Sequence, residues 1–138
     1  MRTFACVSVT GVLLSGCVAF PIPHDRLATP VVEGTVVDSR TKAPVAGARI
    51  TVASTYGGAH ATVTSDASGK FRAYASTQAS WYYFTLLNIE GVCEGQFSVE
   101  SDGYRASAFT AKYFNWGGID GLCSSTPIQR SVELDRDG

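Results

Sequence analysis

The chain has 138 residues, of which 45% are hydrophobic and 17% are charged, and its formal net charge is −1. This length leaves room for one domain, and the hydrophobic content excludes an intrinsically disordered chain. A near-neutral domain without a basic stripe is a poor partner for nucleic acid, because neutralised phosphates supply most of that affinity. The composition therefore indicates one globular domain and no nucleic-acid partner.

The first segment has the pattern of an export signal. Arg2 supplies one positive charge, residues 3–14 are mostly apolar, and the run closes on L-S-G-C at residues 14–17. A short apolar run after a basic start, ending in small residues, is typical of a secretory signal and is too short to span a bilayer. The ending resembles the bacterial lipobox, whose cysteine is acylated and becomes the new N-terminus. We expect residues 1–16 to be the signal peptide and Cys17 to carry the lipid; the alternative is an ordinary signal peptide with a chance cysteine.

The residues after the cysteine indicate the localisation of the protein and the presence of a tether. Val18, not aspartate, follows the cysteine, and by resemblance to enterobacterial sorting this favours the outer membrane, with the domain facing the periplasm. Residues 18–30 contain three of the five prolines and no usable periodicity, which predicts an extended segment. We therefore expect residues 17–30 to be an acylated tether, with the membrane as partner through the lipid, and residues 31–138 to be the folded domain.

From Val31 onward, short apolar or alternating runs are separated by turn residues, and no convincing helix is present. About seven or eight strands with turns every eight to twelve residues predict an all-β fold, an antiparallel β-sandwich. Two hairpins are expected, one across Asp66–Gly69 and one around Asp102-Gly103. The expected strands are 31–38, 48–54, 61–65, 70–76, 81–89, 96–100, 104–112 and 126–134.

The four cysteines separate into three roles. Cys6 is lost with the signal and Cys17 is used by the lipid, which leaves Cys93 and Cys123. In an oxidising compartment the remaining two most simply form one disulfide. A metal role for them is disfavoured, because there is no C-x-x-C motif and neither histidine is close to either cysteine in the sequence.

Residues 34–38 (GTVVD), Thr41 and residues 44–50 (PVAGARI) resemble the carboxypeptidase regulatory-like family, whose members carry a G-x-V-x-D…T-x-x-P-V-x-G-A-x-V signature. Residues 65–71 (SDASGKF) match its second half, T-D-x-x-G-x-F, with serine in place of threonine. The resemblance implies a transthyretin-like (prealbumin-like) sandwich that acts as an accessory, binding or structural module. It transfers no catalytic residue. In structural terms, Gly47 permits a positive-φ turn and Phe71 points into the core.

The sequence contains no recognisable set of catalytic or metal-binding residues, so we expect a protein that is not an enzyme and that uses no cofactor and no metal. A serine nucleophile would need His60 as base, and no G-x-S-x-G elbow is present. His24 lies in the tether and is a weak ligand candidate. Asp66 and Ser68 suggest either a calcium-binding turn or a plain β-turn, and the turn is preferred because hard cations want six or more oxygen ligands.

Three aromatic residues, Trp81, Tyr113 and Trp116, are the candidate ligand-binding positions. The last two lie in a glycine-rich segment that Cys123 would tie back to Cys93. This segment either folds over the sheet and buries its aromatics as a second small core, or leaves them exposed as a platform for sugar rings or a protein.

The sequence thus predicts a membrane-anchored cell-envelope lipoprotein whose β-sandwich is a non-catalytic binding or structural module, with an envelope protein or glycan as partner. The alternative is a docking component or inhibitor-like factor of an envelope or secretion machine. A glycan binder should show coplanar exposed aromatics, whereas a docking subunit should show a broader apolar patch with a polar rim.

Overall fold

The computed structural model describes residues 17–55, 58–85, 90–116 and 123–138, and within these ranges every regular element is a β-strand. The expected signal peptide lies outside the described residues, as do residues 86–89 of the strand expected at 81–89. No helix in the described ranges is long and apolar enough to cross a membrane. The strands are β1 (Cys17–Phe20), β2 (His24–Leu27), β3 (Val32–Asp38), β4 (Arg49–Ser54), β5 (His60–Thr64), β6 (Lys70–Ala73), β7 (Ser76–Ala79), β8 (Tyr82–Thr85), β9 (Glu90–Glu100), β10 (Ser107–Trp116) and β11 (Ile128–Leu134).

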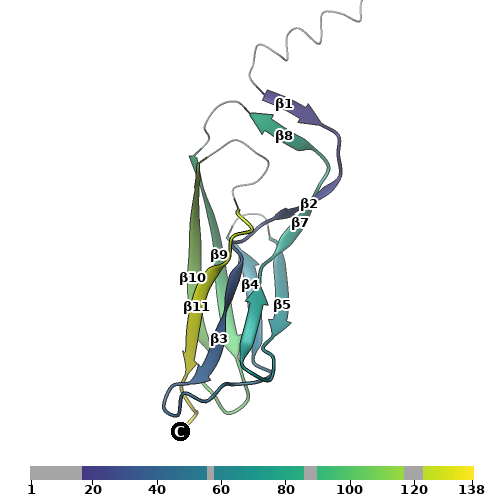
Figure 1. Cartoon of the computed structure of the whole chain (residues 1–138). Helices are drawn as coiled ribbons and strands as arrows, with labels where there is room; N and C mark the ends of the chain where they lie inside the picture. Colours follow the sequence, from purple (N-terminus) through teal and green to yellow (C-terminus); the bar gives the residue numbers. More distant parts are fainter. Residues whose placement is uncertain (1–16, 56–57, 86–89, 117–122) are drawn as a thin grey trace, which may run out of the picture.

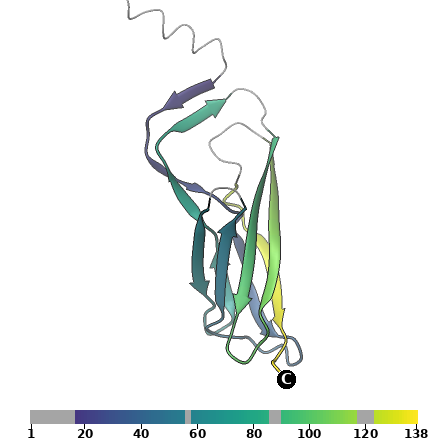
Figure 2. The same ribbon diagram turned by 180° about the vertical axis from the view of Figure 1, so that it is seen from behind.

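Seven of these strands form a sandwich of two sheets packed face to face (Figures 1 and 2). The larger sheet has the order β10-β9-β4-β5, and the smaller has the order β11-β3-β6. The remaining four strands pair as two short ladders, β1 with β8 and β2 with β7. The predicted all-β, transthyretin-like sandwich is confirmed.

The core follows from the two-residue period of the strands, because alternate side chains of each sheet point between the layers. The rings of Phe97 and Phe109, opposite each other on β9 and β10, stack with their centroids 5.1 Å apart. Phe71 is 6% exposed, which confirms the expectation that it points into the core. Other fully or nearly fully buried core residues are Val32, Val36, Ile50, Val52, Val99, Val132 and Leu134.

Gly47 and Gly34 show two different reasons why the fold requires glycine. Gly47 has φ 71°, which confirms the expected positive-φ turn before β4. Gly34 pairs with Arg130 of β11, and a Cβ at Gly34 would lie 1.8 Å from the backbone oxygen of Arg130. Any larger residue would therefore separate the two strands.

The hairpin around Asp102-Gly103 is confirmed, with longer strands than expected. β9 and β10 pair in register from Val99–Ser107 to Glu90–Trp116, and Gly103 in the connecting turn has φ 78°. The hairpin predicted across Asp66–Gly69 is wrong. β5 pairs with β4 and β6 pairs with β3, so this turn carries the chain from one sheet to the other.

The expectation of a wholly antiparallel sandwich is wrong at one pair, since β11 runs parallel to β3. Both strands start at the same end of the sandwich (Figure 1). There the backbone N–H of Ile128 donates to the oxygen of Val31 at 2.8 Å. β11 fills the free edge beside β3 from that end, which only a parallel pairing allows.

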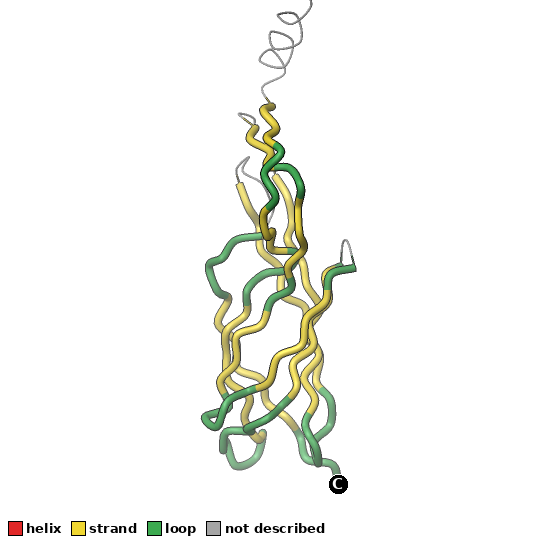
Figure 3. The backbone as a smooth tube through the Cα atoms, turned by 90° about the vertical axis from the view of Figure 1, so that its right-hand side faces the viewer, coloured by secondary structure: helices red, strands yellow, loops and turns green. Residues whose placement is uncertain are grey.

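The segment expected to be a tether is more ordered than a linker. β1 and β8 pair from Cys17–Thr85 to Phe20–Tyr82, and β2 and β7 pair from His24–Ala79 to Leu27–Ser76. Together they make a two-stranded ribbon (residues 17–27 and 76–85) that projects from one end of the sandwich, opposite the C-terminus (Figure 3). Its two prolines, Pro21 and Pro23, fall between the ladders, where a missing N–H breaks no ladder hydrogen bond.

Candidate functional site at the amino-terminal ribbon

Among the acidic residues that the structure describes, Asp38 has the most strongly shifted pKa; it is 1% exposed at the end of β3. Its Oδ1 accepts the backbone N–H groups of Thr41 at 2.7 Å and Arg40 at 3.1 Å. Its Oδ2 accepts from Arg136 Nε at 2.6 Å and from Tyr104 Oη at 3.2 Å. The Thr41 N–H, followed by the Arg136 guanidinium, holds the pKa of this carboxyl well below its usual range. A carboxylate so fully hydrogen-bonded clamps the C-terminal segment to the fold and has little capacity left for chemistry.

Asp66 is a second carboxylate that accepts hydrogen bonds from the backbone of a turn. Its Oδ1 accepts the Ser68 hydroxyl at 2.7 Å and the backbone N–H groups of Ser68 and Lys70 at 2.8 and 2.9 Å. The Ser68 hydroxyl and the Lys70 N–H lower the pKa of Asp66. Gly69 N–H donates to the Asp66 carbonyl at 2.9 Å, which closes the turn. The β-turn interpretation of this motif is therefore confirmed.

The two histidines lie apart from these carboxylates. His60 is exposed on β5, an edge strand, with its Nδ1 3.4 Å from the carbonyl oxygen of Gly58. His24 begins β2, with its Nδ1 2.8 Å from the carbonyl oxygen of Ile22. In the part of the chain that the structure describes, no three His, Cys, Asp or Glu residues gather as a metal-binding group.

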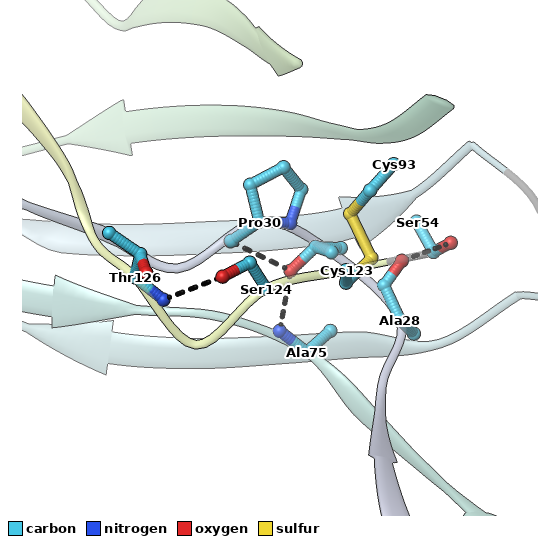
Figure 4. The surroundings of a disulfide bond; sticks show 9 residues. Ala28, Pro30, Ser54, Ala75, Cys93, Cys123, Ser124 and Thr126 are labelled. Carbon is cyan, nitrogen blue, oxygen red and sulfur yellow. Dashed lines mark hydrogen bonds between the residues drawn. A yellow bond between two sulfur atoms is a disulfide. The ribbon is translucent and has the colours of Figure 1, made fainter. Parts of the chain in front are cut away.

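The disulfide between Cys93 and Cys123 is present, with a Cα–Cα distance of 5.0 Å (Figure 4). It joins β9 to the segment that leads into β11. Beside it the buried Thr29 accepts the backbone N–H of Ala75 at 2.8 Å and donates to the Pro30 carbonyl at 3.2 Å. This end of the sandwich is therefore fixed both by a covalent bond and by buried hydrogen bonds.

The base of the ribbon is attached at the same place. Ala28 N–H donates to the carbonyl of Ala75 at 2.8 Å, which continues the pairing of the two chain segments beyond β2 and β7. The hydroxyl of Ser54, at the end of β4, donates to the carbonyl of Ala28 at 3.0 Å. The ribbon is thus joined to both sheets of the sandwich.

Cys17, the expected lipidation site, is the first residue of β1, and its backbone pairs with Thr85 at the outer end of the ribbon. The chain around it carries no charge: residues 17–23 and 73–85 contain no Asp, Glu, Lys or Arg. Among the side chains of the ribbon that the structure describes, the exposed large apolar ones are Phe20, Ile22 and Trp81. The outer half of the ribbon, residues 17–23 and 80–85 (the ribbon tip), is therefore uncharged, and its exposed apolar side chains lie at its inner end, near the break between the two ladders.

The three aromatic candidates belong to two different elements. Trp81 lies in the ribbon between β7 and β8. Tyr113 is half-buried on β10, directly opposite the disulfide-bonded Cys93 in the ladder. Trp116 ends β10; its side chain and residues 117–122 lie outside the described part of the chain. The ligand-binding role of these aromatics stays a prediction. No pattern in the sequence indicated that Trp81 shares the ribbon with Cys17.

Two open hollows lie on the outer faces of the sheets. The one on the smaller sheet, about 780 Å³, contains Glu33, which accepts hydrogen bonds from Arg72 and, at 3.1 Å, from Gln129. The one on the larger sheet, about 290 Å³, is lined by uncharged residues that include Thr51, Gln96, Ser98 and Thr110.

Two stacked sheets with this strand order define the chain as a transthyretin-like β-sandwich domain. The chain matches the carboxypeptidase regulatory-like domain family over residues 31–113, more than half of its length, and it belongs to that family. The family is one of non-catalytic sandwich modules. The match confirms the resemblance that residues 34–50 and 65–71 carry. No curated protein compared with the chain matches it.

Proposed function

We propose that this protein is a lipid-anchored lipoprotein of the cell envelope, in which Cys17 carries the lipid and the sandwich is a non-catalytic binding or structural module. The observation that carries the proposal is that Cys17 begins β1, the strand at the outer end of the ribbon, away from the sandwich (Figure 1). A lipid attached there enters a membrane without passing the folded domain. The L-S-G-C sequence at residues 14–17 supports acylation at this cysteine.

The anchor determines where the sandwich acts. Each buried methylene of an acyl chain contributes about 0.8 kcal/mol, so that one chain anchors marginally and two or more anchor stably. Confinement near a membrane raises the effective concentration of the module for envelope partners. Val18 after the cysteine favours the outer membrane, with the sandwich in the periplasm.

For the partner itself, the end of β10 is the candidate surface on the sandwich. Phe114 is 68% exposed there, next to the half-buried Tyr113. An exposed aromatic supplies a large contact area at a small entropic cost, which suits either a glycan or a protein. We propose Tyr113 and Trp116 as the residues that contribute to this contact.

Replacing the anchor cysteine tests the proposal. Cys17→Ser should abolish incorporation of a palmitate analogue and release the protein from the membrane fraction. Cys6→Ser is the matched control, because it removes a cysteine from the expected signal and should leave both readouts unchanged. A Cys17→Ser protein that stays with the membrane, together with a wild type that takes up no label, would overturn the proposal.

A further inference from the structure

The tip of the ribbon exposes apolar side chains that the sandwich does not cover. The exposed fraction is 48% for Phe20, 54% for Ile22 and 47% for Trp81. Single exposed apolar residues are ordinary on a soluble protein, but a group of them on one small element indicates an interaction surface.

The register of the ribbon shows that these residues belong to one place. The last pair of the outer ladder is Phe20–Tyr82, and the first pair of the inner ladder is His24–Ala79. Three residues, 21–23, therefore lie opposite two, 80–81. Ile22 and Trp81 stand at the same level of the ribbon, and Phe20 is one strand pair further out.

The link between the two ladders is held by local hydrogen bonds. The N–H of Ile22 donates to the carbonyl of Phe20 at 2.9 Å, and the carbonyl of Ile22 lies 2.8 Å from Nδ1 of His24. Ile22 is thus presented on a defined backbone rather than on a free linker, which reduces the entropy lost when it binds.

We infer that the tip of the ribbon is a membrane-contact element, in which Phe20, Ile22 and Trp81 insert into the interface of the bilayer that receives the lipid on Cys17. This inference rests on the proposed acylation. The chemistry favours lipid, because tryptophan and apolar side chains partition into the interfacial region. The neighbouring segments, residues 17–23 and 73–85, contain no charge that would resist this transfer or pair with a protein.

The dimensions agree with this contact. Phe20 is three residues from Cys17, or about 10 Å along a strand. The headgroup region of one leaflet is roughly 5–8 Å thick. An upright ribbon would therefore carry Phe20 beyond the headgroups, whereas a ribbon that lies along the surface holds Phe20, Ile22 and Trp81 all at the interface. We therefore expect the ribbon to lie along the bilayer surface. The first charged residues on this strand, Asp25 and Arg26, come only where the ribbon approaches the sandwich.

The test measures the depth of Trp81 in a bilayer. The protein is purified from membranes and reconstituted into phosphatidylethanolamine–phosphatidylglycerol vesicles, with and without lipids brominated on their acyl chains. Wild type is compared with Trp81→Phe, so that the difference between them isolates Trp81 from Trp116, the other tryptophan. We expect bromolipid quenching of the Trp81 emission, and protection from an aqueous quencher, as for a group about 5–10 Å deep.

Two further variants test whether the tip causes this insertion. Ile22→Asp places a charge beside Trp81 and should reduce the bromolipid quenching several-fold. Thr62→Asp places the same charge at an exposed position of β5 and should leave the quenching unchanged.

The mass of the N-terminal peptide is read from the same preparation and reports on the proposed acylation separately. An acylated, vesicle-bound protein whose Trp81 is open to the aqueous quencher and unaffected by bromolipid overturns the membrane contact alone, and favours a protein partner at the tip. A chain without acyl groups overturns the lipoprotein proposal. Bromolipid quenching of Trp81 in such a chain would still support insertion of the ribbon tip. A chain with neither acyl groups nor quenching would overturn both the lipoprotein proposal and the membrane contact.

Discussion

Removing the disulfide should cost about 3.5 kcal/mol of folding free energy. Cys93 and Cys123 are 30 residues apart in the sequence. In the chain-entropy model, a cross-link that closes a loop of this length destabilises the unfolded chain by about 3.5 kcal/mol. Either Cys123→Ala or the double alanine variant removes this contribution. Because Cys93 is 3% exposed, the double variant should lose roughly 1 kcal/mol more, for the buried sulfur.

The assay is urea unfolding at neutral pH, followed by tryptophan fluorescence and extrapolated linearly to water. The dependence of the unfolding free energy on urea concentration should become steeper in the variants, because an unfolded chain without the cross-link is more expanded. Hydrogen exchange should show the largest loss of protection in β11 (Ile128–Leu134), since the disulfide ties the segment that leads into this strand to β9. The reasoning is refuted if Cys123→Ala loses less than about 1 kcal/mol while mass spectrometry shows the wild-type disulfide intact.

Three other substitutions test the packing and the clamp. Phe97→Ala should lower the free energy of unfolding by about 3–5 kcal/mol, whereas Phe114→Ala should change it by less than about 0.5 kcal/mol, because only Phe97 is buried. Equal effects of the two variants in urea unfolding would contradict the placement of Phe97 in the core. Gly34→Ala should cost about 3 kcal/mol, since its Cβ collides with the Arg130 carbonyl; a wild-type melting temperature would contradict the close approach. Asp38→Asn should destabilise the protein at pH 7, and the difference in unfolding free energy from wild type should shrink as the pH falls below about 4. The reason is that the lowered pKa of Asp38 stabilises the fold only while the carboxyl of the unfolded chain, with a pKa near 3.9, is ionised. A pH-independent difference in urea unfolding would refute this.

Patterns within short stretches of the sequence predicted the positions of strands, a turn and a core residue. Alternation located the strands of the sandwich, Gly47 marked a positive-φ turn, and Phe71 was expected in the core. The disulfide followed from counting, since Cys93 and Cys123 were the two cysteines without another role.

The pairing of the strands could not be predicted in the same way. β5 and β6 alternate as a hairpin would, yet they belong to different sheets, because alternation identifies the inward face of a strand but not its neighbour. The parallel pairing of β3 and β11 joins residues almost a hundred positions apart, which no local pattern records.

The same limit applies to the candidate site. The prolines of residues 18–30 correctly indicated an extended chain, but not its partner strands β7 and β8. Trp81 was therefore recognised as an aromatic residue of interest without its position in the ribbon of Cys17. The clamp on Asp38 was also missed, because Tyr104 and Arg136 are 66 and 98 residues away.

The most direct test of the lipid anchor is the mass of the N-terminal tryptic peptide of the mature protein, isolated from membranes. We expect a peptide that begins at Cys17, ends at Arg26 and carries acyl chains on the cysteine. A mature protein that begins at another residue, or a Cys17 with an unmodified side chain and a free amino group, would contradict the account.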